Sequence, residues 1–227
     1  MVQFGAEQHA MMFALLAEEA MKRFGAQAED IAREAVRRYG ERRGARMAKR
    51  ARSDGQPADM VSYLAYGELN MEEADHVTSI LPAPYIKVAC TNCGWHESWK
   101  KSGKLKYGKY YCQEIDRAIT RGFNPSLRLD VEGTMPNGAA QCVFHWYDGR
   151  IGPDEGRRLA ELRETKKDVI RPWDFHTQDL YDMVTRVFVE RMGDEGRRAA
   201  EAALQAFSDR NGEEAAQRVA APASEMP

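Results

Sequence analysis

The chain has 227 residues, with 33 Lys and Arg against 35 Asp and Glu, so its formal net charge is −2. Hydrophobic residues make up 43 % of the chain and charged residues 30 %, a globular composition that excludes collagen-like and low-complexity proteins. The near-zero charge argues against a nucleic-acid coat protein. The longest apolar run, Ala10 to Ala17, is far shorter than the ~20 residues of a membrane span, and no signal peptide is recognisable. We therefore expect a cytoplasmic protein with no nucleic-acid or membrane partner.

Three zones follow one another along the chain. Residues 1–73 and 151–219 have helical patterns and are expected to pack together as one domain, whereas residues 74–150 form an α+β unit between them. Residues 220–227 are expected to be a flexible tail.

The two helical zones repeat each other at a constant offset of 168 positions, the separation of Gly25 and Gly193. Matched pairs at this offset include Tyr39 with Phe207, Arg42 with Arg210, and Gly44 with Gly212. The pattern predicts a duplicated helical hairpin in which Gly25 and Gly193 end the first helix of each copy. Each copy needs a cover for its apolar stripe, which the other copy and one face of a sheet can provide.

The central zone changes to a period of two. Residues 86–90, 127–131 and 142–146 alternate apolar and polar side chains, and residues 74–80 are a candidate fourth strand before Pro82 and Pro84. The turn signal at 136–138 predicts that the last two strands form an antiparallel hairpin.

Two helices are expected between these strands. One runs from Trp95 to Lys101 and ends at Gly103, and the other runs from Tyr110 to Arg121 with Gly122 as its terminal residue. The fold class is therefore α+β: an antiparallel four-stranded sheet with helices on one face, flanked by N- and C-terminal helical hairpins.

Cys112 is the most interesting single position, because it falls in the first turn of the helix expected after Gly108. Unpaired N–H groups and the helix dipole at that end lower the pKa of a thiol and favour the thiolate. Asp116 lies one turn later on the same face, so the two residues can present a nucleophile and a proton-handling carboxylate to one pocket. On these residues alone, a packed Cys112 and a surface Asp116 remain the favoured alternative.

Cysteine and histidine also raise the question of a metal. Cys90 and Cys93 have zinc-knuckle spacing, but Cys112 and Cys142 are single, so a four-cysteine zinc site is an alternative to free thiols in the core. His176 opens the helix expected over about 172–191, where the dipole keeps an imidazole neutral and able to act as a base. We expect neither a metal nor a cofactor.

Arginine forms a basic stripe at helical spacing, made of Arg38, Arg42, Arg46 and Lys49. A solvated face is the favoured interpretation, and contact with phosphates is the alternative. Arg43 differs, because it lies between Tyr39 and Met47 on an apolar stripe, and its guanidinium is expected to pair with a buried carboxylate or a substrate carboxylate. Glu68 is a candidate for the same pocket, and His145 is expected to point from the opposite sheet face toward the helical zones.

Several short motifs occur together: Arg43-Gly44-Ala45-Arg46, Tyr63-Leu64-x-Tyr66-Gly67-Glu68, Cys93-Gly94-Trp95, Tyr111-Cys112-x-x-x-Asp116, Gly122-Phe123-Asn124-Pro125 and Cys142-x-Phe144. In this combination the chain resembles the L-2-amino-thiazoline-4-carboxylic acid hydrolase family over roughly residues 25–210. Gly94 departs from the proline of the family pattern. The central unit is also similar to small α+β ligand-binding domains of the 4-vinyl-reductase type.

The resemblance implies hydrolysis of a C–N bond in a small cyclic amidine-like heterocycle. A nucleophile must attack the ring carbon, and an acid must protonate the leaving ring atom. The candidate catalytic residues are Cys112, Asp116 and His176, and the candidate substrate-binding residues are Arg43, Arg46, Glu68, Asn124 and His145.

Two other functions stay open. The same pocket is compatible with a non-catalytic module that senses a small ligand or a metal, and the basic stripe is compatible with nucleic-acid binding. The Ala-rich hairpins also make a homodimer plausible.

Overall fold

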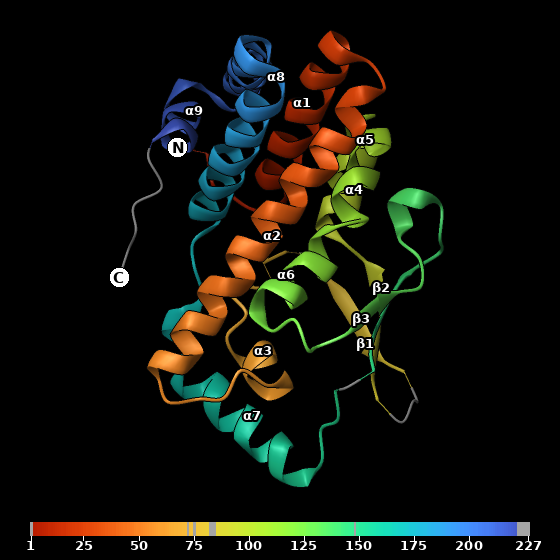
Figure 1. Ribbon diagram of the computed structural model, residues 1–227, viewed down its shortest axis with the longest axis vertical. Helices are drawn as coiled ribbons and strands as arrows, with labels where there is room; N and C mark the ends of the chain where they lie inside the picture. Colours follow the sequence, from red (N-terminus) through yellow and green to blue (C-terminus); the bar gives the residue numbers. More distant parts are fainter. Residues whose placement is uncertain (1, 72, 75, 82–84, 148, 222–227) are drawn as a thin grey trace.

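The computed structural model describes residues 2–71, 73–74, 76–81, 85–147 and 149–221 (Figure 1). The N-terminal part contains α1 (Ala6–Phe24), α2 (Gln27–Ser53) and α3 (Met60–Ala65). The central part contains β1 (Val77–Ile80), β2 (Ile86–Asn92), α4 (Gly94–Lys101), α5 (Leu105–Cys112), α6 (Ile115–Phe123), β3 (Leu129–Val131), the short 3-10 helix η1 (Met135–Asn137) and β4 (Cys142–Trp146). The C-terminal part contains α7 (Pro153–Thr165), η2 (Lys167–Val169), α8 (Trp173–Asn211) and α9 (Glu213–Ala220).

The two predicted helical hairpins lie side by side, with α8 packed along α1 and α2. Gly25 has φ 57° and ψ −140°, and Gly193, which interrupts α8, has φ 59° and ψ −137°. These positive φ values are unfavourable for residues with a Cβ atom, so glycine at both places has a direct steric reason. The repeat in the sequence therefore corresponds to the same backbone turn in both copies.

Three residues of the basic stripe, Arg38, Arg42 and Arg46, form ion pairs with acidic residues of α8, whereas Lys49 is exposed. Arg42 lies 2.6 Å from Asp179, and Arg38 lies 2.5 Å from Glu190. These pairs use the charges of the stripe to join α2 to α8.

The sheet has the strand order β1-β2-β4-β3, and every neighbouring pair is antiparallel. Cys90 is opposite Cys142 in the β2–β4 register. The predicted hairpin between β3 and β4 is confirmed, and Gly138 closes its turn with φ 91°. The predicted fourth strand is confirmed as β1, whereas Pro82 and Pro84 lie outside the described residues, as do residues 222–227 of the expected tail.

The helices cover one face of this sheet, as Figure 1 shows, which confirms the α+β class. The other face is polar: Lys87 binds Glu132 at 2.8 Å, and the ring of His145 stacks on that of Tyr147 with centroids 4.0 Å apart. The expectation that His145 points toward the helical zones is therefore wrong, because those zones lie on the Cys142 side of the sheet.

The segment predicted as one helix from Tyr110 to Arg121 is two helices. α5 ends at Cys112 and α6 begins at Ile115, so Cys112 lies at the end of a helix and not in its first turn. Gly122, which was expected to end the helix, lies inside α6, which continues to Phe123. The reason for a glycine there is the close crossing of α6 over α2.

At this crossing the two backbones approach each other through glycine. A Cβ atom at Gly44 of α2 would lie 2.1 Å from the carbonyl oxygen of Ile119, and one at Gly122 would lie 2.3 Å from that of Glu41. Such distances are far below van der Waals contact, so either side chain would push the helices apart. The crossing fixes where α6 lies relative to α2.

Gly44→Ala is expected to lower the free energy of unfolding by about 1–3 kcal/mol, because the cost of overpacking exceeds the gain in helix propensity. Gly156→Ala is the matched control, since a Cβ atom there meets only Ile151, at an ordinary 3.8 Å, within helix α7. The control should be neutral or stabilising by up to about 1 kcal/mol. Urea unfolding of both variants measures the difference, and equal stabilities would contradict the close crossing.

Candidate active site

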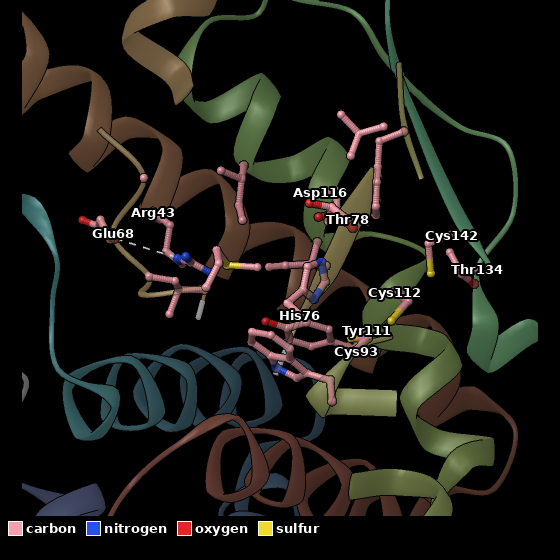
Figure 2. Close-up of a pocket in the computed structure, with 18 of the residues that line it drawn as sticks. Arg43, Glu68, His76, Thr78, Cys93, Tyr111, Cys112, Asp116, Thr134 and Cys142 are labelled. Atoms are coloured by element: carbon pink, nitrogen blue, oxygen red, sulfur yellow. Dashed lines mark ion pairs between the residues drawn. The ribbon is translucent and has the colours of Figure 1, made fainter. Parts of the chain in front are cut away.

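A cavity of about 340 Å³ lies between the helix-covered face of the sheet and helices α2, α5 and α6. This volume is in the range of small-molecule sites. Most of the lining is apolar, and it includes Met47, Leu69, Met71, Val88, Trp95, Ile115, Ile119, Phe144 and Trp146. The polar and sulfur-bearing side chains are the ones that give the cavity its chemistry, and Figure 2 shows how they are distributed.

Arg43 and Glu68 lie together at one side of the view in Figure 2. Each is only 4 % exposed, and Arg43 Nε is 3.8 Å from Glu68 Oε2, which is an ion pair without a hydrogen bond. Glu68 instead accepts two hydrogen bonds from Arg46, whose Nε and one terminal nitrogen lie 2.6 and 2.8 Å from the two carboxylate oxygens. Among the described residues, the buried Arg43 Nε has no hydrogen-bond partner.

Cys112 and Asp116 both line the cavity, although not as the sequence suggested. The end of α5 gives no dipole stabilisation to a thiolate, and burial raises the pKa of Cys112 well above its usual value. Burial, together with the negative charge of Cys93, raises the pKa of Asp116 to about 6. Asp116 can therefore hold or release a proton near neutral pH, whereas Cys112 stays protonated.

Four predicted site residues are not among those that line the cavity. Arg46 lies behind Glu68, and His176 is fully buried, with its Nε2 3.1 Å from the carbonyl oxygen of Glu68. Burial lowers the pKa of His176 well below its usual value, so it is neutral as expected but enclosed. Asn124 donates to the carbonyl oxygen of Ala58 at 2.8 Å, and His145 lies on the far side of the sheet. These positions give Asn124 and His145 no direct route to a ligand in the cavity.

The structure adds residues that the sequence did not single out for this site: His76, Thr78, Tyr111, Thr134 and, above all, Cys93. Cys93 directly precedes α4, so the argument about a thiol at a helix start applies to it and not to Cys112. That signal was available from the expected helix beginning at Trp95. His76 carries no such signal, because it comes from an irregular segment just before β1.

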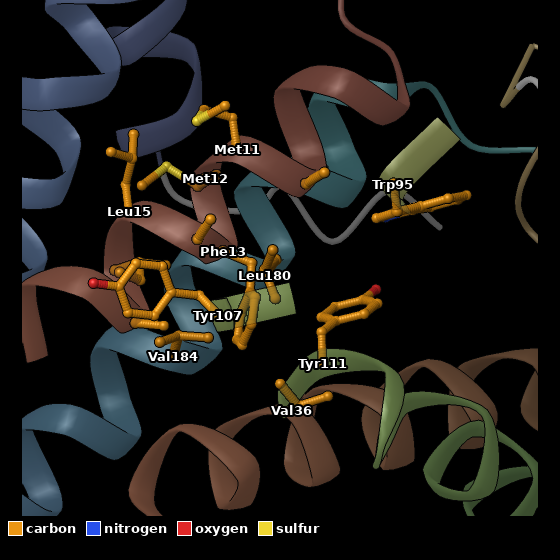
Figure 3. Packing of buried hydrophobic residues seen from close by; sticks show 14 of the residues in the cluster. Met11, Met12, Phe13, Leu15, Val36, Trp95, Tyr107, Tyr111, Leu180 and Val184 are labelled. Carbon is orange, nitrogen blue, oxygen red and sulfur yellow. The ribbon is translucent and has the colours of Figure 1, made fainter. Parts of the chain in front are cut away.

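The cavity adjoins the main core through Tyr111 and Trp95, which Figure 3 shows beside the α1 side chains. The rings of Phe13 and Tyr111 have centroids 5.2 Å apart. Trp95 Nε1 donates to His9 Nδ1 at 3.0 Å, and His9 Nε2 lies 3.1 Å from the Tyr39 hydroxyl. This buried chain fixes the aromatic wall of the cavity.

The part of the chain that the structure describes contains no group of three or more His, Cys, Asp or Glu side chains arranged to hold a metal ion. Its cysteines are free thiols. A search of the same residues finds no helix with an apolar stretch long enough to cross a bilayer.

Asp116→Asn is expected to stabilise the fold increasingly as the pH rises from 4 to 7. Below about pH 4 the carboxyl group is protonated in both states. Between pH 4 and 6 the unfolded chain ionises while the buried group keeps its proton, so the wild-type protein loses stability that the amide variant retains. The difference in unfolding free energy should grow by about 1–3 kcal/mol.

Urea unfolding at pH 4, 5.5 and 7 measures this difference. Asp30→Asn is the control, because the Asp30 side chain is 90 % exposed and its variant should differ from the wild type by a nearly constant amount. A difference for Asp116→Asn that does not change with pH would show that Asp116 titrates like an ordinary surface carboxylate.

In a comparison with protein families, residues 5–146 match the model described as L-2-amino-thiazoline-4-carboxylic acid hydrolase. No curated protein and no solved structure matches the chain. The matched region extends from α1 to the end of β4 and includes all the residues named above that line the cavity. The family model covers more than half of the chain, and the protein therefore belongs to the L-2-amino-thiazoline-4-carboxylic acid hydrolase family.

Proposed function

We propose that the protein opens a small cyclic amidine-like heterocycle that carries a carboxylate, by hydrolysis at the amidine carbon inside the 340 Å³ cavity. Membership of the family supports a hydrolase of this substrate type. The cavity supports the same function through two features: a buried cation at one end, and thiols with a proton-carrying carboxyl group elsewhere on its wall.

The observation that best supports the proposal is the burial of the Arg43 guanidinium with a donor that has no hydrogen-bond partner in the part of the chain that the structure describes. A guanidinium that is 4 % exposed normally has its donors satisfied, because an unpaired buried donor is costly. Here Glu68 is held by Arg46 and lies too far from Arg43 Nε for a hydrogen bond. A substrate carboxylate can take the free donors, since guanidinium and carboxylate geometries match. The site is thus selective for an acid.

The reaction needs a nucleophile at the ring carbon and an acid at the leaving atom. Asp116 is suited to the second task, because its pKa of about 6 lets it give a proton and take it back near neutral pH. A cysteine thiol is suited to the first, since sulfur is a strong nucleophile once it is ionised. The apolar lining excludes bulk water from the ring and strengthens the electrostatic interactions around it.

Arg43→Gln tests the role of the cation. We expect KM for 2-amino-thiazoline-4-carboxylate to rise about 10- to 100-fold, the usual value of a hydrogen bond to a charged group. The wild-type enzyme should prefer this substrate over its uncharged 4-carboxamide, and the variant should lose that preference. Steady-state kinetics on both compounds measures the ratio, which does not depend on the fraction of folded enzyme.

Arg42→Gln is the matched control, because Arg42 neighbours Arg43 on α2 but binds Asp179 and Asp182 outside the cavity. It should leave the carboxylate preference intact. An Arg43→Gln enzyme that still prefers the carboxylate would exclude Arg43 as its binding group.

A further inference from the structure

We propose that the nucleophile of this site is Cys93, assisted by His76 and Cys90, and not the Cys112 that the sequence motif indicates. The inference rests on the proposed function, because it assigns a residue to the attack on the ring carbon. It stands on the position of the sulfur in the fold, on its neighbours and on the cavity that it shares with Arg43.

Cys93 occupies the junction between β2 and α4. It is the residue immediately before α4, in an extended conformation, and its carbonyl oxygen accepts the Glu97 N–H at 3.0 Å. The first N–H groups of a helix have no intrahelical acceptor and carry partial positive charge. Cys93 is thus the residue that precedes those groups, and its side chain, which is 8 % exposed, lines the cavity.

His76 and Cys90 complete the surroundings of this sulfur. His76 Nδ1 lies 3.8 Å from Cys90 Sγ, and Cys90 is three residues before Cys93 at the end of β2. The Cys90 thiol, the His76 ring and the main-chain N–H of His96 hold the pKa of Cys93 well below its usual value. The pKa of Cys90 is raised in turn, because its neighbour takes the negative charge.

Gly94 allows the segment before His76 to pack closely against the start of α4. A Cβ atom at Gly94 would lie 2.3 Å from the carbonyl oxygen of Ala74, so any side chain there would push residues 73–74 away from α4. The close contact keeps His76, two residues later, beside Cys93. Gly94 is thus a positioning residue for the pair.

The other two thiols of the cavity lack this support. Cys112 is at the end of α5, where the dipole disfavours a negative charge, and burial raises its pKa. Cys142 accepts the Met135 N–H at 3.3 Å, yet burial still raises its pKa to about 11. Asp116 of α6 and Tyr111 of α5 are further titratable groups that line the cavity with Cys93, and none of these four groups is a cation.

The buried Arg43 Nε, which has no hydrogen-bond partner among the described residues, is the independent sign that a ligand belongs in this cavity. In Figure 2 its guanidinium points toward the interior from one side, while Cys93, His76 and Tyr111 lie together in another part of the view. A ring held by its carboxylate at Arg43 would then project its reactive carbon toward the sulfur cluster.

The chemical step balances with water as the only co-reactant. The Cys93 thiolate forms a bond to the amidine carbon, and the C=N π electrons move onto nitrogen. The electron pair on nitrogen then re-forms the C=N bond as one ring bond to that carbon breaks, and the leaving heteroatom takes its proton from Asp116. Water adds to the same carbon, the C=N π electrons move onto nitrogen again, and one water proton goes to the Asp116 carboxylate. Return of that electron pair breaks the C–S bond and releases the Cys93 thiolate, and the remaining hydroxyl proton moves to nitrogen, which leaves a urea.

Thiol labelling tests the assignment without any substrate. The intact protein is treated with limiting iodoacetamide at pH 6, and the modified peptides are identified by mass spectrometry. Cys93 should react at least about tenfold faster than Cys112 and Cys142, because its pKa is lowered by its neighbours whereas burial raises theirs. His76→Gln should shift the pH dependence of Cys93 labelling upward. Faster labelling of Cys112 would overturn the proposal.

Activity variants test the catalytic role. Cys93→Ser should lower kcat by at least about 1000-fold, whereas Cys112→Ser should cost far less, and thermal unfolding checks that each variant is folded. Labelling also separates the two proposals: no turnover of the heterocycle by a wild-type protein with a reactive Cys93 would refute the proposed function alone. Full activity of Cys93→Ser would refute the nucleophile assignment alone.

Discussion

Burial of the Arg43 guanidinium is the constraint on which the site and its surroundings depend. Removing an ion from water costs several kcal/mol, so the surrounding residues must compensate for it. Glu68, held by Arg46, supplies the opposite charge at 3.8 Å. Burial, with a further contribution from the Arg43 charge, lowers the pKa of His9 to about 3 and keeps His176 neutral as well. Burial and the Arg43 charge therefore act in the same direction and keep both histidines neutral.

That region gives the cavity a rigid wall. Because Trp95 donates to Nδ1 of the neutral His9, the ring proton is on Nε2 and points to the Tyr39 hydroxyl, which in turn lies 3.4 Å from the carbonyl oxygen of His176. Each group has a partner, so the chain of contacts fixes the tautomer and the ring positions. A wall that is ordered before a ligand arrives reduces the ordering cost of binding.

Local patterns in the sequence were sufficient to predict the strands, the helix on each side of Gly25, and the pocket that Arg43 and Glu68 share. An arginine on an apolar stripe and a strand with alternating residues are local signals, and local physics governs them. The position of Cys112 was mispredicted because no local signal marks the break at residues 113–114, after which α6 takes its own direction and crosses α2, a contact between distant segments. His76 was not predicted for the same reason, since only the close approach of Ala74 to Gly94 brings it to the sulfur atoms.

Gly44 and Gly212 occupy equivalent positions in the two hairpins and have opposite effects. Gly44 remains helical and lets α6 pass, so α2 continues to Ser53 and carries Arg43 and Arg46 alongside the cavity. Gly212 has φ 90° and stops α8, and the residue equivalent to Arg43 is Asn211, which only caps its own helix. The two hairpins therefore share the same turn, but only the first one contributes side chains to the cavity. An ancestral doubling of this hairpin would have left one copy free to acquire polar chemistry while the other preserved the scaffold.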